Sequence, residues 1–199
     1  MSVSKDWVIM SSSSTLLKKV RACRTCEKDL PLGPRPVLQY DSSATLLIVG
    51  QAPGRRVHES GRPFDDPSGV RLRQWLNVTE EEFYDPKRLA IVPMGFCYPG
   101  TGKSGDLPPR KECLQWREPL MEGLPNIQLT ILLGQYAQRY HYPEHKGSLT
   151  DLVKQVDLDS STIVPLPHPS PRNNRWLKQQ PWFEEEFIPR LQHKLKAFF

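Results

Sequence analysis

Apolar residues gather in four short segments of the chain, at 45–50, 89–94, 129–134 and 162–166, and a turn signal or a glycine follows each of them. Short apolar runs with such boundaries are typical of buried strands. Helical patterns lie between them, at 70–76 and from Gln135 onward. Because strands alternate with helices, the order predicts a parallel sheet between helical layers.

The last part of the chain, 182–199, carries apolar side chains at helical spacing. We expect a helix that packs against the core and is bent or broken by Pro189. Two other segments, 99–109 and 165–171, are rich in turn-forming residues, above all proline. We expect both to be stiff surface loops.

The length of 199 residues suits one domain, and we expect a single domain over 1–199 with a flexible N-terminal segment at 1–20. Lys and Arg outnumber Asp and Glu by 27 to 22, and the pI is near 9.1. A polyanion, with nucleic acid as the leading candidate, is therefore the expected partner, and an ordinary basic protein is the alternative. No apolar run approaches the roughly 20 residues of a membrane span, so we expect no membrane role. We also expect a cytoplasmic protein and a monomer.

The first apolar segment ends abruptly in the turn Gly-Gln-Ala-Pro-Gly at 50–54. Turns of this kind bind ligands at the carboxyl ends of parallel strands. Glycine lets backbone N–H groups approach an anion, and Pro53 fixes the turn without donating a hydrogen bond. We expect Gln51 to face a pocket, and the alternative is an ordinary connection between a strand and a helix.

The four cysteines fall into two pairs. Two residues separate Cys23 from Cys26, and fifteen separate Cys97 from Cys113. In a cytosolic protein such a set argues against disulfides. Four thiolates can hold zinc or an iron-sulfur cluster, and composition does not choose between the two. The alternative is four buried and chemically inert thiols.

One histidine lies in a loop of prolines. His168 stands between Pro167 and Pro169, directly after the last predicted strand. An imidazole on so rigid a loop can donate a hydrogen bond to a leaving group at low reorganisation cost. The alternative is a surface histidine without a chemical task.

Three separated blocks together resemble the uracil-DNA glycosylase superfamily, and most closely its iron-sulfur branch, family 4. The first block is the turn at 50–54 followed by Gly-Arg-Pro-Phe at 61–64, which is similar to that branch's first motif, Gly-Glu-Ala-Pro-Gly, and its Gly-Arg-Pro-Phe segment. The second is His-Pro-Ser-Pro at 168–171, similar to the superfamily's second motif. The third is the cysteine set, whose spacings resemble those of the branch's [4Fe-4S] ligands.

The resemblance implies a three-layer α/β/α sandwich around a central four-stranded parallel sheet. It also implies an enzyme of base excision repair, which flips a damaged base out of DNA and hydrolyses its N-glycosidic bond without a covalent lysine intermediate. The expected lesion is uracil or a related deaminated base. The expected cofactor is a [4Fe-4S] cluster held by Cys23, Cys26, Cys97 and Cys113, with zinc as the alternative.

Carried over residue by residue, the resemblance gives Phe64 the task of stacking on the base and His168 that of binding a base carbonyl. The turn residues Gln51, Ala52, Pro53 and Gly54 would line the pocket. Arg172 takes a place where relatives often carry an intercalating side chain. Phosphate contacts are expected from Ser170 and from cations near the two motifs, namely Arg55, Arg56, Arg71, Arg73, Arg172, Arg175 and Lys178.

The chain departs from the branch at two positions. Gln51 stands where the branch has a carboxylate, and an amide can hold a water but takes no proton from it. The strand before Cys97 lacks the asparagine with which relatives read the base, so the main chain, Gln51, Asn173 or Asn174 would read it instead.

The missing carboxylate needs a substitute, and Asp65, next to Phe64, is our first candidate. Asp66 or Ser68 is instead expected to cap the helix at 70–76. Two other functions stay open on the sequence: a non-catalytic DNA-binding or damage-sensing protein of the same superfamily, and a hydrolase or binder of a free nucleoside.

Overall fold

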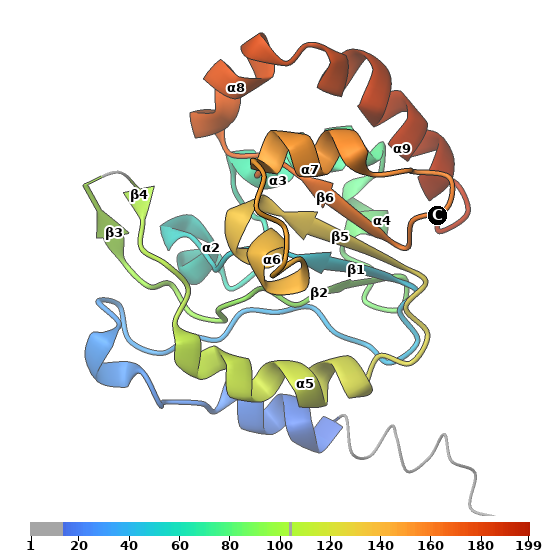
Figure 1. Cartoon of the computed structure of the whole chain (residues 1–199). Helices are drawn as coiled ribbons and strands as arrows, with labels where there is room; N and C mark the ends of the chain where they lie inside the picture. The colour runs from blue at the N-terminus through green and yellow to red at the C-terminus, as the bar shows by residue number, and fades with distance from the viewer. Residues whose placement is uncertain (1–13, 104) are drawn as a thin grey trace, which may run out of the picture.

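The computed structural model describes residues 14–103 and 105–199. Four parallel strands form its main sheet, in the order β2-β1-β5-β6 (Figure 1). They are β1 (Leu46–Val49), β2 (Leu89–Ile91), β5 (Leu129–Leu133) and β6 (Ile163–Leu166). Leu46 is in register with both Leu89 and Leu129. The four predicted strands are confirmed, and β2 ends at Ile91, before its predicted end at residue 94.

Helices cover both faces of this sheet, as the predicted α/β/α sandwich requires. Leu46 and Ile48 belong to one buried cluster, whereas Leu47 and Val49 belong to another on the opposite face. The helices are α2 (Arg55–Ser60), α3 (Pro67–Leu76), α4 (Glu80–Phe83), α5 (Leu114–Glu122), α6 (Gly134–His141), α7 (Leu149–Gln155), α8 (Asn174–Gln179) and α9 (Ile188–Leu195). Short 3-10 turns are η1 (Glu27–Asp29), η2 (Lys111–Cys113) and η3 (Pro171–Asn173), and η4 (Phe183–Phe187) is a π-helix.

The C-terminal helix changes its geometry part-way, as the position of Pro189 suggested. A π-helical turn over Phe183–Phe187 gives way to α9, with Pro189 in the first turn of α9. Proline is tolerated there because the first N–H groups of a helix have no partner within it. Phe183, Phe187 and Leu191 are buried in the core, so the predicted packing is confirmed.

Two expectations concern irregular segments. Residues 14–21 are helical, and Leu16, Leu17 and Val20 pack against the core, so this part of the segment expected to be flexible at 1–20 is ordered; the rest of that expectation falls on 1–13, which lie outside the described residues. The segment 99–109 is not a loop throughout. It contains an antiparallel hairpin of β3 (Thr101–Gly102) and β4 (Gly105–Asp106), in which the Thr101 hydroxyl donates to Oδ1 of Asp106 at 3.0 Å.

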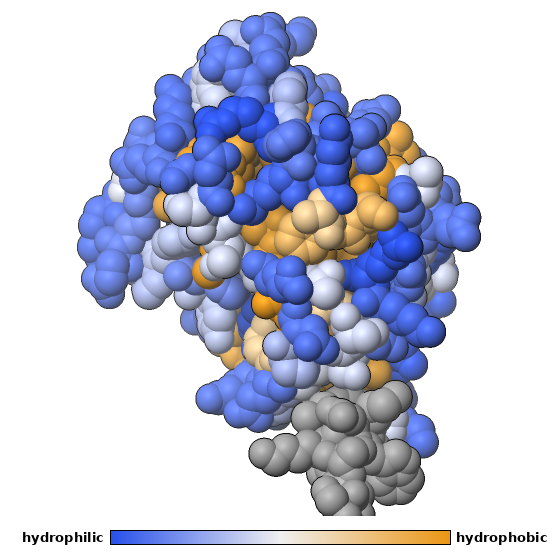
Figure 2. All heavy atoms as spheres, turned by 90° about the vertical axis from the view of Figure 1, so that its right-hand side faces the viewer, coloured by the Kyte–Doolittle hydropathy of each residue, from blue (hydrophilic) through white to orange (hydrophobic). Residues whose placement is uncertain are grey.

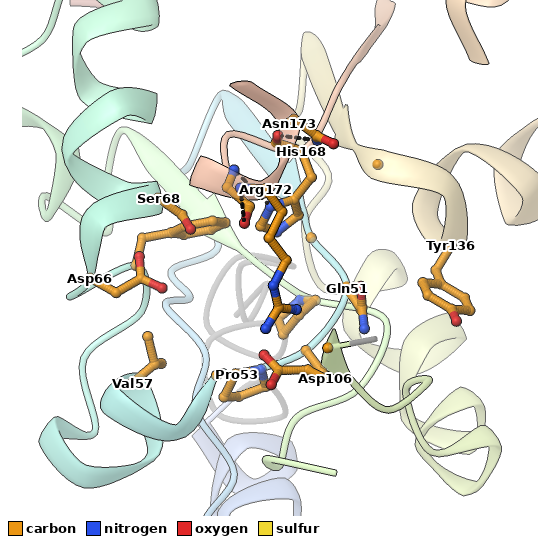
Figure 3. A pocket seen from close by; sticks show the side chains of 18 of the residues that line it. Gln51, Pro53, Val57, Asp66, Ser68, Asp106, Tyr136, His168, Arg172 and Asn173 are labelled. Atoms are coloured by element: carbon orange, nitrogen blue, oxygen red, sulfur yellow. Dashed lines mark hydrogen bonds between the residues drawn. The ribbon is translucent and has the colours of Figure 1, made fainter. Parts of the chain in front are cut away.

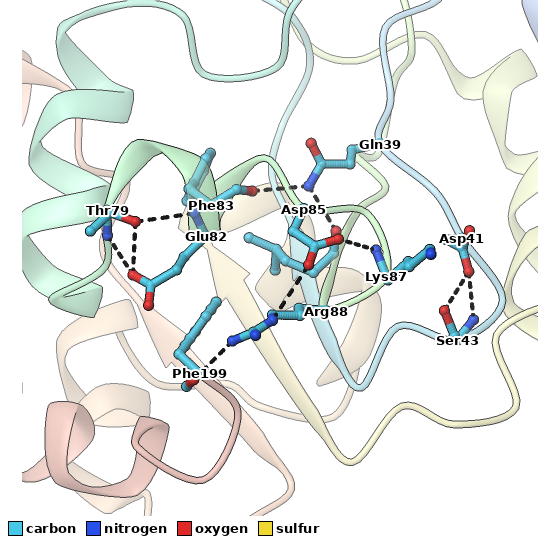
Figure 4. A network of polar contacts seen from close by, with 11 residues as sticks. Gln39, Asp41, Ser43, Thr79, Glu82, Phe83, Asp85, Lys87, Arg88 and Phe199 are labelled. Atoms are coloured by element: carbon cyan, nitrogen blue, oxygen red, sulfur yellow. Dashed lines mark hydrogen bonds and ion pairs between the residues drawn. The ribbon is translucent and has the colours of Figure 1, made fainter.

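The open edge of the sheet, β2, is covered by the chain that precedes β1. Gln39 and Ile91 exchange backbone hydrogen bonds of 3.0 and 2.8 Å, and the side-chain amide of Gln39 donates to the carbonyls of Phe83 and Leu89 (Figure 4). Arg88 ties the C-terminus to the same region by donating to the carbonyl of Phe199 at 2.8 Å. These contacts leave little of the edge free for pairing with another strand.

Charged and polar side chains cover most of the face on which the C-terminus lies, with apolar atoms showing between them (Figure 2). Phe198 and Phe199 are partly buried and pack against the core. No helix in the described part of the chain is long and apolar enough to cross a membrane.

Candidate active site

A large cavity of about 840 Å³ opens at the carboxyl ends of β1, β5 and β6 (Figure 3). The chain runs from β1 outward to β2 and then returns to place β5 on the other side of β1. Ligand sites of open parallel sheets lie where the strand order reverses in this way. The position of the cavity therefore follows from the topology.

The turn after β1 forms one wall of this cavity, as predicted. Gln51, Ala52, Pro53 and Gly54 all line it. Backbone hydrogen bonds of 2.9 Å from Met94 to Gly50 and from Gly95 to Gln51 fix the turn against the segment after β2. The wall is thus held by main-chain contacts and is rigid before any ligand binds.

Phe64 lines the cavity next to this turn, and its backbone is unusual. Its φ is +55°, a left-handed conformation that is uncommon outside glycine. The ring lies against Gly50, where a Cβ would stand 3.3 Å from Cζ, and meets Phe83 edge-on at 6.2 Å between centroids. The carbonyl of Phe64 abuts Gly69 in α3, so that a side chain at 69 would overlap it. The stacking candidate is therefore locked in one orientation.

His168 enters the cavity from the loop after β6 (Figure 3). Its Nδ1 accepts a hydrogen bond of 3.2 Å from the N–H of Ser170. Nδ1 therefore carries no proton, and the proton of the neutral ring is on Nε2. The Nδ2 of Asn173 donates to the carbonyl of His168 at 2.7 Å and fixes the backbone at this point.

The charge state of His168 follows from its surroundings. Burial lowers the pKa of His168, Asp66 and Asp106 oppose this effect, and Arg172 adds to it. Glycine at 134 makes room for the ring, since a Cβ there would stand 3.2 Å from that of His168 and φ is +77°. The imidazole is consequently neutral near pH 7 and offers a single donor.

The side chain of Gln51 does not point freely into the cavity. Its Nε2 donates a hydrogen bond of 3.0 Å to the carbonyl of Leu107, directly after the β3–β4 hairpin. The hairpin thereby forms a second wall, and Asp106 and Gly105 line the cavity. The guanidinium of Arg172 lies against Gly105, where it would overlap any Cβ.

Sequence reasoning missed Asp106 because the segment 99–109 was treated as a surface loop. Its turn residues gave no indication of a hairpin folded over the first motif. Tyr136 and Trp176 also line the cavity and were not singled out.

Asp65 is not brought to the cavity. Its side chain is exposed and it is not among the residues that line the site. The N–H of Asp65 closes a turn onto the carbonyl of Arg62 at 3.3 Å, and the left-handed Phe64 inside that turn reverses the chain. Asp66 does line the cavity, and its Oδ1 accepts from the N–H of Gly69 at 2.9 Å as the N-cap of α3. The capping prediction is confirmed for Asp66.

The predicted phosphate-binding residues divide into two groups. Arg55, Arg56, Ser170 and Arg172 line the cavity, whereas Arg71, Arg73, Arg175 and Lys178 do not. Arg71 donates to the carbonyl of Ser170 at 3.2 Å and to Oδ1 of Asn174 at 2.8 Å, so it braces the histidine loop. Arg73 lies over the rings of Phe83 and Tyr84. Contacts with other protein groups thus account for the positions of the Arg71 and Arg73 side chains.

All four cysteines line a second, small cavity between the N-terminal segment and η2. They are free thiols, and burial raises the pKa of Cys97 and of Cys113 to about 11. Arg110 lines the same cavity, and its buried Nε has no hydrogen-bond partner among the described residues. The Nη2 of Arg110 donates to Asp29 at 2.8 Å and to Glu112 at 2.9 Å, joining the N-terminal segment to η2.

The four cysteines lie close enough to affect one another, since, besides burial, Cys23 and Cys26 both raise the pKa of Cys97 and of Cys113. Within 14–103 and 105–199, no three His, Cys, Asp or Glu side chains are placed to hold a single metal ion. A cluster of four iron atoms separates its sulfur ligands farther than one tetrahedral ion does. The donor set, which is four thiols from three segments in an apolar surrounding, fits such a cluster.

Comparison with known families decides where the chain belongs. The family model of the uracil DNA glycosylase superfamily matches residues 38–192. The chain belongs to this superfamily. The matched range contains the turn at 50–54, Phe64 and the histidine loop, which line the large cavity. Cys23 and Cys26 lie before the matched region.

Among solved structures, the chain resembles a Methanosarcina acetivorans protein determined by solution NMR and provisionally described as a uracil DNA glycosylase. The two share 17% sequence identity with a TM-score of 0.47, over 79% of this chain and 94% of the other. The likeness is loose, and the superfamily assignment rests on the family model.

Proposed function

We propose that this protein is a monofunctional DNA glycosylase that removes uracil or a related deaminated base from DNA. The observation that carries the proposal is the neutral His168, whose Nε2–H has no partner within the described residues and can donate into a cavity that Phe64 also lines. A flipped base entering this cavity would stack on the ring of Phe64 and accept a hydrogen bond from Nε2 through a carbonyl oxygen.

Hydrolysis of the N-glycosidic bond needs a hydrogen-bond donor at the base and a water molecule at the sugar. As the N-glycosidic bond breaks, negative charge develops on the departing base, and a fixed donor stabilises that charge without reorganising. His168 is suited to this because hydrogen bonds from Ser170 and Asn173 fix its ring and its backbone in place. A neutral donor also needs no protonation step.

Cations at the rim of the cavity support DNA as the substrate. Arg55, Arg56 and Arg172 line it together with the hydroxyl-bearing Ser170. Contacts of such side chains with phosphates make the affinity fall as salt is raised. A free nucleoside lacks the phosphate backbone, so salt-insensitive binding would favour a small ligand instead.

We also propose that Cys23, Cys26, Cys97 and Cys113 hold a [4Fe-4S] cluster. Burial raises the pKa of the Cys97 and Cys113 thiols, so metal binding by these two residues would release protons. When bound, the cluster would cross-link the N-terminal segment to the loop after β2 and to η2. A brown protein with stoichiometric iron and sulfide is expected after anaerobic purification, and a colourless protein with stoichiometric zinc would contradict the cluster.

An excision assay tests the activity. Labelled oligonucleotides carrying uracil or hypoxanthine are incubated with the protein and then treated with alkali to cut at abasic sites. We expect excision of at least one lesion, and a rate about 100-fold lower for His168→Ala, the typical cost of losing one oxyanion donor. His193→Ala, an exposed histidine in α9, is the matched control.

The alternative function within the superfamily is damage binding without cleavage. Gln51, an amide that takes no proton from water, favours it. Lesion-specific binding in a gel-shift assay without any abasic product would support this alternative and would reject the glycosylase.

A further inference from the structure

The hydrogen bond from Gln51 to Leu107 links the first motif to the β3–β4 hairpin. The donor is the side-chain amide of Gln51 and the acceptor is a backbone carbonyl, 3.0 Å away. An ionised carboxylate at position 51 could not make this contact, because it only accepts hydrogen bonds. Glutamine at position 51 is thus specifically suited to holding the β3–β4 hairpin against the turn at 50–54.

The hairpin, held in this position, places a carboxylate group in the lining of the cavity. Asp106 directly precedes Leu107 and projects toward the turn, with its Oδ2 3.6 Å from where a Cβ on Gly54 would stand (Figure 3). Its other oxygen, Oδ1, accepts from the hydroxyl of Thr101. The N–H of Leu107 donates to the carbonyl of Gly100 at 2.8 Å, so the backbone on both sides is fixed.

The other acidic side chain that lines the described cavity already has a structural partner. Asp66 caps α3 through its Oδ1. In Asp106, by contrast, Oδ2 is available to a ligand, because the one hydrogen bond of this side chain within the described part of the chain uses Oδ1. Figure 3 shows Asp106 and His168 entering the cavity from opposite sides, one near Pro53 and the other near Asn173.

We propose that Asp106 is the group that positions and deprotonates the attacking water, and that Gln51 is a positioning residue that acts by seating the hairpin. This inference rests on the proposed glycosylase function. The carboxylate that sequence comparison expects at position 51 would thereby be supplied from the hairpin.

In the proposed step, the bond between the sugar carbon C1′ and the base nitrogen breaks, and its electron pair leaves with the base. The oxygen of a water molecule forms the new bond to C1′, and one proton of that water passes to the Asp106 carboxylate. His168 stabilises the base anion, which takes its proton from solvent. Atoms and charge balance without any further reactant.

The first experiment compares Asp106→Asn with the wild type and with Asp159→Asn, an exposed aspartate far from the cavity. We expect Asp106→Asn to lower the single-turnover excision rate about 100-fold, the usual contribution of a general base. Its affinity for uracil-containing DNA should be unchanged or higher, because a negative charge has been removed near phosphates.

The possible outcomes separate this inference from the function it rests on. A wild type that excises no lesion contradicts the proposed function itself. A wild type that excises, together with an Asp106→Asn variant that excises at the same rate, overturns the role of Asp106 alone. Weaker DNA binding with an unchanged excision rate also overturns it, since Asp106 would then only contact DNA.

A double-mutant cycle tests Gln51. We expect Gln51→Leu to lower the excision rate and to speed amide hydrogen exchange at Leu107, because the hairpin loses its anchor. In the Asp106→Asn background, Gln51→Leu should cost little further, since both changes remove the same carboxylate. If the two substitutions instead lower the excision rate by factors that multiply, Gln51 acts independently of Asp106, and its positioning role is overturned.

Discussion

Gly69 and Phe64 touch through their backbones: the carbonyl oxygen of Phe64 occupies the space that a Cβ on Gly69 would need. This contact joins the first turn of α3 to the residue whose ring lines the large cavity. The left-handed Phe64 can persist because the helix behind it approaches this closely. The orientation of the Phe64 ring therefore depends on a glycine that does not itself line the cavity.

We predict that Gly69→Ala lowers both stability and excision. The new methyl group must push the backbone of Phe64 away from α3, which we expect to cost about 2 kcal/mol of unfolding free energy. Urea denaturation and the excision assay measure the two effects. Val70→Ala, at a half-exposed neighbouring position, is the control and should change neither. A Gly69→Ala variant as stable and active as the wild type would show that the ring needs no such support.

The cap of α3 gives a second prediction. Asp66→Ala removes the acceptor of the Gly69 N–H and should cost about 1 kcal/mol, whereas Asp66→Asn should retain most of the stability because asparagine caps nearly as well. Thermal unfolding of the two variants distinguishes them. Equal losses would mean that the negative charge, and not the cap, stabilises this end of the helix.

The pH dependence of stability should reflect His141. Burial, together with the charge of the neighbouring Arg117, lowers the pKa of His141 to about 4. In the unfolded chain this pKa is about 6.5. Between these values the unfolded state binds the extra proton, so stability falls as the pH drops from about 6.5 toward 4. His141→Gln should flatten that decline in melting temperature, whereas His193→Gln should leave it as steep as in the wild type.

Loss of one cysteine should affect the fold more than the chemistry. Cys97 lines the small cavity and is not among the residues that line the large one. We expect Cys97→Ser to lose bound iron and to melt several degrees lower, because the N-terminal segment is no longer cross-linked. Iron analysis and calorimetry measure this. A variant that melts normally but no longer excises would instead assign the cysteines to catalysis.

Local patterns were enough to predict the sheet. The four strands follow from nearly continuous apolar runs such as Leu129–Leu133, which are typical of strands buried on both faces. The cap at Asp66 and the change of geometry near Pro189 also follow from residues next to each other in the chain. Such features depend on backbone preferences that a short segment carries by itself.

The composition of the active site depended on contacts between distant residues. The sequence by itself determined that Gln51 and His168 each follow a strand, and it placed Gln51, Phe64 and His168 in one cavity through their resemblance to known motifs. Only the tertiary structure decided that Asp65 points away and that Asp106 points in. The physical reason is that a hydrogen bond between Gln51 and Leu107, 56 residues apart, sets the position of the hairpin, and no local pattern encodes such a contact.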